Sequence, residues 1–269
     1  MQFCQWAYIP IFFMAFLSTD ASQANMYKWT DDQGIVHFSD TRPSEVEKAD
    51  NIFQGAMHNE SSPHTIEFYD GFEYDDSPVN HGWRFTFGGN DDFVFTTSER
   101  AHFGSKCLKG FQAANRTTHT RFGLSYDLSQ KGIGKDIGAR DTVDVVIHWY
   151  DDGVTKSDYN FHPRLDFRDA DGMSRDVCIS DTGCGQYAFR KSDSYAKVDI
   201  CRRWRGWHKI KYRVEHNRLD LYFDGKLVSK GHAQVTELQK IFWSSNIISP
   251  GQTALSWIDD VRVTRTHYK

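Results

Sequence analysis

Apolar and polar residues alternate along much of the second half of the chain. Over residues 207–214 the alternation has a period of two, which is typical of a half-buried strand. A polar turn and a second extended run, residues 219–223, follow. Asp224-Gly225 then predicts a tight hairpin into residues 226–228, because glycine takes positive φ without steric cost. The pattern predicts consecutive strands rather than helices.

These strands carry a resemblance to a known family. The run "W-H-x-I-x-Y-x-V … L-x-L-Y-F-D-G-K-L-V" over residues 207–228 resembles the strand–hairpin unit of concanavalin A-like (laminin G-like, laminarinase-like) jelly rolls, and residues 257–263 resemble their final strand. The resemblance implies an all-β fold, a two-sheet concanavalin A-like jelly-roll sandwich, and contact with glycans outside the cytoplasm. This fold contains both binding modules and enzymes, so it does not decide between them.

Composition agrees with a large β domain. Of 269 residues, 15% are aromatic, and the chain has Gly 20 but only Pro 6, which suits an all-β domain of about 200 residues. That length favours the concanavalin-like sandwich over the smaller galactose-binding jelly roll, which is the alternative. Lys+Arg 32 against Asp+Glu 36 gives no electrostatic attraction to nucleic acid. We expect a monomer whose partner is a polysaccharide or oligosaccharide.

Residues 1–24 have the pattern of a signal peptide. Residues 7–17 form an apolar core too short to span a bilayer, and Ser22-Gln23-Ala24 provides small residues before a cleavage point. No Lys or Arg precedes the core, which leaves an uncleaved anchor as the alternative. We expect a periplasmic or secreted protein with no transmembrane segment in its mature chain.

A small β-hairpin unit is predicted over residues 25–45. Residues 26–43 contain a strand, a glycine turn, a strand and a terminating proline. They resemble a short domain of unknown function with the consensus "Y-K-W-x-D-x-x-G-x-x-H-F-S-D-x-x-P", typical of Gram-negative envelope proteins. Residues 46–63 are polar and predict a linker, and residues 64–269 predict the jelly-roll domain.

Four cysteines follow the signal peptide. They are Cys107, Cys178, Cys184 and Cys201. An even number in an oxidising compartment predicts two disulfides, and the short Gly-containing segment from Cys178 to Cys184 favours a local pair. The sequence leaves the connectivity open. A zinc site is the alternative, which the lack of a C-x-x-C pair disfavours.

Three segments resemble the calcium site of carbohydrate-binding jelly rolls, "G-F-E … A-x-x-G-x-x-x-L … I-D-D-V". They are residues 69–73, 101–108 and 258–261. The resemblance implies a structural calcium with Glu73 and Asp260 among its ligands, and carboxylate oxygens suit this ion. The alternative is that these acids are solvated at strand ends or pair with Arg262 or Lys109.

Three segments, residues 143–150, 160–168 and 186–190, have one polar side, which predicts a glycan-binding groove. Planar polar groups bind sugar hydroxyls in pairs, and arginine holds carboxylates bidentately. The alternative is the solvated side of an ordinary sheet. The predicted ligand-binding residues are Asp144, His148, Tyr150, Asn160, His162, Arg164, Asp166 and Arg168.

Catalysis is weakly supported by the sequence. The laminarinase-type "E-x-D-x-x-E" string is absent from the sequence. The strand most similar to it, residues 141–146, lacks both glutamates. Alginate-lyase-like jelly rolls carry "Q-I-H", "R-x-E-L" and "Y-x-K-x-G-x-Y"; residues 145–148 resemble the first, without its Gln. The segment around Arg121 resembles "R-x-E-L" but lacks its Glu. Only residues 240–243 resemble "Y-x-K-x-G-x-Y".

The resemblance implies His148, Arg121 and Tyr150 as the residues of a β-elimination reaction. Because two of the three motifs are degraded, we favour a non-catalytic glycan-binding protein. A divergent polysaccharide lyase acting on a uronate-containing glycan is the alternative, and a purely structural envelope protein is the third hypothesis.

Overall fold

The computed structural model divides the chain into two units, Met1–Ser61 and Ser62–Lys269. The structure describes residues 27–30, 36–39 and 50–51 as strands, and residues 64–268 except 88–89, 91–92, 113–121, 154–160, 182–184, 191–196, 232, 246–247 and 249. The predicted signal peptide lies outside the described residues. None of the described helices is long and apolar enough to cross a membrane.

The first unit contains a small antiparallel sheet. Strand β1 (Tyr27–Thr30) pairs with β2 (Val36–Ser39) in the register Tyr27↔Ser39, which agrees with the predicted strand–turn–strand pattern. A two-residue strand, β3 (Asp50–Asn51), pairs with the other edge of β1. The segment predicted as a linker therefore contributes backbone hydrogen bonds to this sheet.

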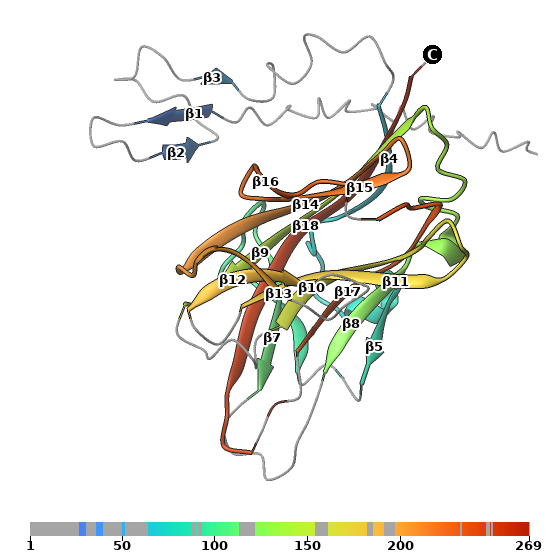
Figure 1. The fold of residues 1–269 in the computed structure, drawn as a ribbon. Coiled ribbons are helices and arrows are strands. Elements are labelled where there is room, and N and C mark those ends of the chain that lie inside the picture. The colour runs from blue at the N-terminus through green and yellow to red at the C-terminus, as the bar shows by residue number, and fades with distance from the viewer. Residues whose placement is uncertain are drawn as a thin grey trace, which may run out of the picture. The chain divides into compact units, whose positions relative to one another are not determined.

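The second unit is a two-sheet jelly-roll sandwich of the concanavalin A-like class, as the sequence predicts (Figure 1). Its first sheet has the described strand order β13-β12-β11-β10-β17-β8-β5. These seven strands are β5 (Trp83–Thr86), β8 (Gly123–Asp127), β10 (Phe161–Arg168), β11 (Ser174–Asp181), β12 (Gln186–Arg190), β13 (Lys197–Arg202) and β17 (Glu237–Ser245).

The second sheet has the described order β16-β15-β14-β9-β18-β7-β6, with β4 also paired to β18. Its eight strands are β4 (His64–Asp70), β6 (Val94–Thr97), β7 (Cys107–Gln112), β9 (Asp141–Asp151), β14 (Gly206–Glu215), β15 (Arg218–Phe223), β16 (Lys226–Ser229) and β18 (Ala254–His267). Two short 3-10 helices, η1 (Pro78–His81) and η2 (Ser129–Lys131), lie in connections.

Two tight hairpins join β14, β15 and β16. His216 and Asn217 have φ values of 50° and 60°, and Asp224 and Gly225 have φ values of 48° and 79°. Two consecutive positive φ angles are typical of the type I′ turn, whose twist matches that of the flanking strands. The Asp224-Gly225 hairpin is confirmed, and the preceding turn is shorter than the sequence suggests.

The core lies between the two sheets and follows the alternation in the sequence. On β9, Val143, Val145, Ile147 and Trp149 are buried in it. On β10, Leu165 and Phe167 enter it from the other sheet. Each such side chain contributes about 1.5–3 kcal/mol when fully buried. Asp144 and His148 of β9, and Arg164 and Asp166 of β10, are at the intervening positions and therefore point away from the core in opposite directions.

Candidate functional site

The predicted ligand-binding residues lie on two outer faces of the sandwich rather than in one groove. Asp144, His148 and Tyr150 belong to β9 of the eight-stranded sheet. Arg164, Asp166 and Arg168 belong to β10 of the seven-stranded sheet. The core separates the two sets. The expectation of a single polar groove is therefore corrected, because alternation shows which side of a strand is polar but not which sheet the strand joins.

The remaining predicted residues do not extend either set. Asn160 and Arg121 lie outside the described residues. His162 is buried, and its ring meets that of the core residue Trp149 edge-on with centroids 6.1 Å apart.

Of the residues implied for a lyase, His148 and Tyr150 lie on the same strand, β9, and Arg121 lies outside the described residues. His148 lies on β9, whereas the segment after Arg121 leads into β8, which pairs with β17 in the other sheet. The strand on the opposite side of β17 is β10, not β9. The resemblance of residues 145–148 to "Q-I-H" therefore falls on a strand of the wrong sheet for a site shared with β8 and β17.

On the seven-stranded face, Arg164 is the centre of a charged cluster. Its Nε lies 2.9 Å from Asp166 Oδ1, and the two side chains are only 19% and 21% exposed. Its guanidinium carbon lies 4.1 Å from the ring centre of Phe242, the residue opposite it on β17. The aromatic ring supports one face of the cation, so Arg164 is held flat against the sheet.

The cluster continues onto β11 and β12. Asp176 lies opposite Asp166 in the strand register, and its Oδ2 is 4.0 Å from Arg164 Nε. Arg190 donates a hydrogen bond to Asp176. We call Arg164, Asp166, Asp176 and Arg190 the charged array.

The charged array has hydrogen-bonding capacity to spare. Although Arg164 Nε and Asp166 Oδ1 are close, neither atom makes a hydrogen bond of good geometry. Burial raises the pKa of Asp166 to about 6; the nearby Asp176 also raises it, and the guanidinium of Arg164 opposes the shift. Arg168 lies outside the array, because it pairs with Glu237 at 3.2 Å and donates to the carbonyl of Gly172.

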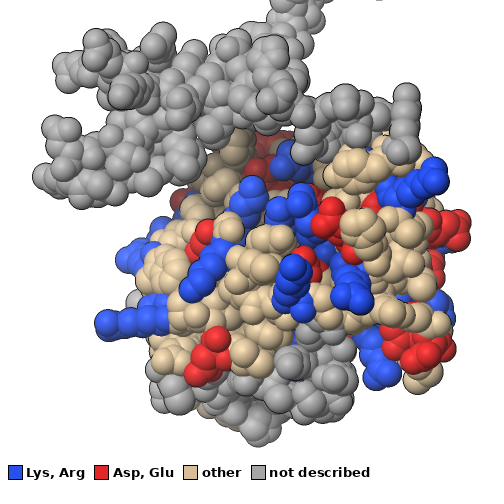
Figure 2. Space-filling model, turned by 45° about the horizontal axis from the view of Figure 1, so that its top comes forward, with Lys and Arg blue, Asp and Glu red and all other residues tan. Residues whose placement is uncertain are grey.

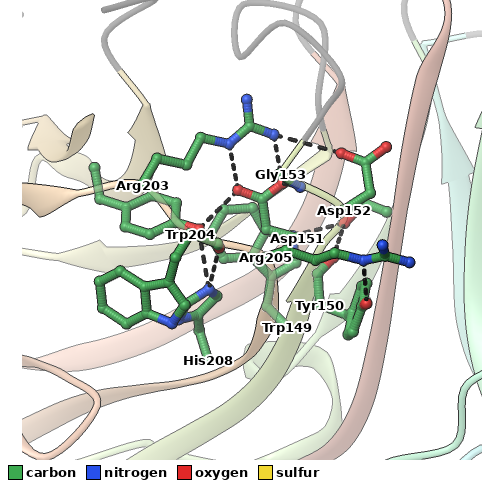
Figure 3. Close-up of polar contacts among 11 residues, drawn as sticks. Trp149, Tyr150, Asp151, Asp152, Gly153, Arg203, Trp204, Arg205 and His208 are labelled. Carbon is green, nitrogen blue, oxygen red and sulfur yellow. Dashed lines mark hydrogen bonds and ion pairs between the residues drawn. The ribbon is translucent and has the colours of Figure 1, made fainter. Parts of the chain in front are cut away.

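On the eight-stranded face, Tyr150 is enclosed by cations and rings. Its hydroxyl accepts a hydrogen bond from Arg100 at 3.1 Å. It accepts a second from Arg205 at 3.0 Å (Figure 3). Trp207 and Trp257 pack edge-on against its ring, at centroid distances of 5.4 Å and 5.3 Å. Tyr150 is thus a buried anchor with its hydroxyl engaged, which argues against a free catalytic phenol.

Charges of both signs occur on the surface of the second unit. Figure 2 shows Lys and Arg side chains across one face of it, with Asp and Glu beside several of them. On β9 and β14, for example, Arg213 donates two hydrogen bonds of 2.8 Å to Asp144. In such pairs the two opposite charges partly cancel each other's field.

His148 lies next to a second histidine and a carboxylate. Its Nδ1 is 3.6 Å from Asp260 Oδ2, and His102 Nδ1 is 3.8 Å from the same oxygen. The two imidazole rings stack with centroids 4.1 Å apart. Burial and the neighbouring His102 lower the pKa of His148 to about 3, so its ring is neutral near pH 7.

Glu73, the other residue implied for calcium, has different partners. Its carboxylate accepts hydrogen bonds from the Ser105 amide (2.8 Å), the Ser105 hydroxyl (2.6 Å) and the Lys106 amide (3.0 Å). Gly104 has φ 65°, and a Cβ there would lie 2.2 Å from Glu73 Oε1. The carboxylate therefore holds this loop. Calcium binding by Glu73 and Asp260 stays a prediction, and the described side chains do not favour it.

A buried polar clamp, missed from the sequence, connects the two sheets. Asp151 is 0% exposed and forms an ion pair with Arg203, which also lies 3.6 Å from Asp152 (Figure 3). The hydroxyl of Tyr187 is 2.7 Å from Asp151 Oδ2. Completing the clamp, His208 lies near that hydroxyl through Nε2 and 2.8 Å from Asp224 Oδ2 through Nδ1.

A signal for this clamp exists in the sequence. Asp151 continues the apolar series of β9, from Val143 to Trp149, at a position that must face the core. His208 likewise begins the inward series of β14. A charged or polar residue at a core-facing position requires a buried partner.

The cysteines do not form the two predicted disulfides. Cys107 is a free, buried thiol that packs with Tyr150 and Trp257, and Cys201 is also free. The prediction is wrong for these two residues, because Cys107 packs in a separate cluster with Tyr150 and Trp257, whereas Cys201 packs against the core between the sheets. Cys184 lies outside the described residues, so a local pair with Cys178 stays a prediction.

A hollow of about 400 Å³ lies at the start of β9. It is lined by residues 139–142, Glu215, His216 and Tyr268. It contains none of the predicted ligand-binding residues. The charged array is a surface feature of the sheet and does not line this hollow.

Comparisons with known proteins place the chain only coarsely. The family model "Domain of unknown function (DUF4124)" matches residues 13–55, which agrees with the domain of unknown function expected near the N-terminus. No curated protein matches the chain.

Several solved structures are similar to the chain. The CBM22-1 xylan-binding domain from Paenibacillus barcinonensis Xyn10C is 14% identical over 78% of this chain and 100% of that chain, with a TM-score of 0.41. An endo-beta-1,4-glucuronan lyase from the fungus Trichoderma reesei is 11% identical (74% and 95% covered, TM-score 0.44). The CBM2 module of the Lactobacillus casei BL23 phage J-1 evolved Dit is 8% identical (77% and 98%, TM-score 0.49). At such low identities and TM-scores, the similarity assigns no ligand or reaction to this chain.

Proposed function

We propose that this protein is an exported, non-catalytic glycan-binding protein whose binding surface is the outer face of the seven-stranded sheet. The observation that carries the proposal is the charged array around Arg164. Its arginines and aspartates are 19–27% exposed and interlocked across three strands, with Phe242 beneath Arg164. A merely solvated face would instead present extended, independent side chains.

The array suits an acidic glycan. A guanidinium binds a sugar carboxylate through two parallel hydrogen bonds, and carboxylates accept hydrogen bonds from pairs of hydroxyls. Arg164 and Arg190 supply the first kind of group, and Asp166 and Asp176 the second. Uronate-containing polysaccharides are therefore the preferred ligand class.

Binding without cleavage is preferred over β-elimination. That reaction needs a general base beside the group that neutralises the uronate carboxylate. The base implied by the sequence, His148, instead lies on the other sheet next to Asp260. Export rests on the signal-peptide pattern of residues 1–24. We accordingly place the protein in the periplasm or outside the cell.

Calorimetric titration of the full chain with uronate and neutral oligosaccharides tests the proposal. We expect binding of a uronate oligomer, and Arg164→Ala should weaken it by about 10- to 150-fold, because a charge-assisted hydrogen bond contributes about 1.5–3 kcal/mol. Arg213→Ala is the matched control: it also removes an arginine paired with an aspartate, but on the opposite face. It should change the affinity less than about twofold.

Folding and turnover are measured on the same samples. Arg164→Lys keeps the positive charge but loses the bidentate geometry, so it separates lost binding from a loss of fold. No binding of any glycan, or equal losses in both alanine variants, would contradict the proposed surface. Ultraviolet absorbance of an unsaturated product would show that the protein is a lyase instead.

A further inference from the structure

Three side chains of types that can bind a metal ion lie close together where β18 shifts its register against β9. The shift lies between Asp259 and Arg262, and Asp260 within it has φ 56°. Such irregularities redirect a side chain out of the regular alternation. Here Asp260 lies beside His148 of β9 and His102 of the connection between β6 and β7. One ligand atom of each residue lies within 4.8 Å of those of the other two.

Both histidines present an unused nitrogen to this point. Nδ1 of His102 and Nδ1 of His148 are buried and make no hydrogen bond among the described residues. Buried polar atoms in proteins are nearly always satisfied, so each exception calls for a ligand or another partner. Two such nitrogens converging on one carboxylate oxygen point to a cation between them.

We propose that His102, His148 and Asp260 bind a transition-metal ion of the zinc class. Zn–N bonds of about 2.0–2.1 Å and Zn–O bonds of about 2.0–2.2 Å place tetrahedral ligand atoms roughly 3.3–3.5 Å apart. The two nitrogen–oxygen distances of 3.6 Å and 3.8 Å exceed this by only a few tenths of an ångström. Because the two imidazole rings are stacked with an interplanar angle of 15°, they must also rotate so that both Nδ1 lone pairs point at the ion.

The surroundings hold the three ligands in place. Asp259 accepts hydrogen bonds from the amides of His102 (2.8 Å) and Phe103 (3.0 Å), which ties the His102 loop to β18. The Trp207 ring packs against the His102 ring at 5.1 Å. Such outer contacts orient ligands in metal sites.

One nearby cation opposes metal binding. Lys209 lies opposite His148 in the β9–β14 register, and burial lowers its pKa. The nearby carboxylates of Asp259 and Asp260 have the opposite effect and favour binding of the metal ion. The side chains of the ligands are 14–26% exposed, so the ion can enter and keep an open position for water or another ligand.

The chemistry of the ligands excludes calcium as the preferred ion. Calcium takes six to eight hard oxygen ligands, whereas imidazole suits zinc, copper and nickel. Glu73, the oxygen donor implied by the sequence resemblance, is held by Ser105 and Lys106. The proposed ion would join β18, β9 and the connection before β7. This site is independent of the glycan-binding surface, which lies on the other sheet.

The test uses the full chain after removal of metal with a chelator and desalting. We expect one equivalent of Zn²⁺ to bind in calorimetry, and Co²⁺ to give the visible absorption of a four-coordinate site. Zn²⁺ should raise the melting temperature, and Ca²⁺ should not. Asp260→Asn and His148→Gln should each weaken Zn²⁺ binding at least tenfold. Asparagine tolerates the left-handed backbone at this position, so Asp260→Asn is expected to fold.

Two control variants separate this site from other zinc-binding groups. His81→Gln also removes an imidazole beside a carboxylate, since His81 pairs with Asp76, and Cys201→Ser removes a free thiol. Both should bind Zn²⁺ like the wild type. The proposal is overturned if wild type binds less than about a tenth of an equivalent, if Asp260→Asn and His148→Gln bind normally, or if Ca²⁺ stabilises the chain and Zn²⁺ does not.

Discussion

The hydroxyl of Tyr187 lies 2.9 Å from Nε2 of His208, and the two residues belong to different sheets of the sandwich. The same hydroxyl is 2.7 Å from Asp151 Oδ2. A polar connection therefore runs through an otherwise apolar core, from β12 to β9 and β14. Because only one arrangement of the sheets satisfies all of these groups, the clamp fixes the position of one sheet against the other.

Removing the hydroxyl should weaken the sandwich without creating a large cavity. Tyr187→Phe leaves Asp151 paired with Arg203 but deprives His208 Nε2 of one partner. We expect the free energy of unfolding to fall by about 1–3 kcal/mol in urea titrations. Tyr222→Phe, on the outer side of β15, is the control and should change it by less than about 0.5 kcal/mol. Equal effects of the two variants would contradict a role for the clamp.

Removing the cation of the clamp should cost more. Arg203→Ala leaves the fully buried Asp151 carboxylate without its ion-pair partner, which typically destabilises a protein by about 3–5 kcal/mol. Arg168→Ala is the matched control, because its ion pair with Glu237 is 45% exposed on the arginine side. It should cost less than about 1 kcal/mol. If both variants unfold at the same urea concentration, Asp151 is solvated rather than clamped.

The sequence predicts the strands and their polar sides well, for a physical reason. Strand periodicity is local: successive side chains of a strand point to opposite faces, so Val145 and Ile147 of β9 face the core together, as do Leu165 and Phe167 of β10. Sheet membership depends instead on pairing between distant segments. Both β9 and β10 show the same alternation, so no local pattern could assign His148 and Arg164 to different sheets.

The candidate sites illustrate the same limit. Arg164 and Asp166 were recognisable from one strand and Arg190 from another, but these residues and Asp176 come together only through the β10–β11–β12 pairing. His102 lies in a loop without periodicity, so its approach to His148 depends on the fold alone. The disulfide prediction failed because an even number of cysteines gives no information on distance. Cys107 packs with Tyr150 and Trp257 outside the main core, whereas Cys201 packs against that core.

The free thiols should differ in reactivity. Cys107 is 0% exposed, and burial raises its pKa to about 12, so it should not react with a thiol reagent such as Ellman's in the native protein. In guanidinium chloride it should react fully. Cys201 is only partly buried and should react in the native state, though slowly. Peptide mapping assigns the labelled residues; recovery of Cys107 or Cys201 in a disulfide would contradict the structure.

The pH dependence of stability should reveal Asp166. Its pKa is about 6 in the folded protein against an ordinary value of 3.8, so between these pH values the folded state binds more protons than the unfolded state. Stability from this group is therefore greatest at low pH and is lost as the pH rises towards 6. The 2.2-unit difference (6 − 3.8) corresponds to at most about 3 kcal/mol. Relative to wild type, Asp166→Asn should become more stable as the pH rises from 4 to 7 in urea titrations. Asp169→Asn should show the opposite trend near pH 4. In the wild type, the hydrogen bond that Asp169 accepts from Arg175 lowers the pKa of Asp169. Parallel curves for wild type and Asp166→Asn would show that Asp166 ionises normally.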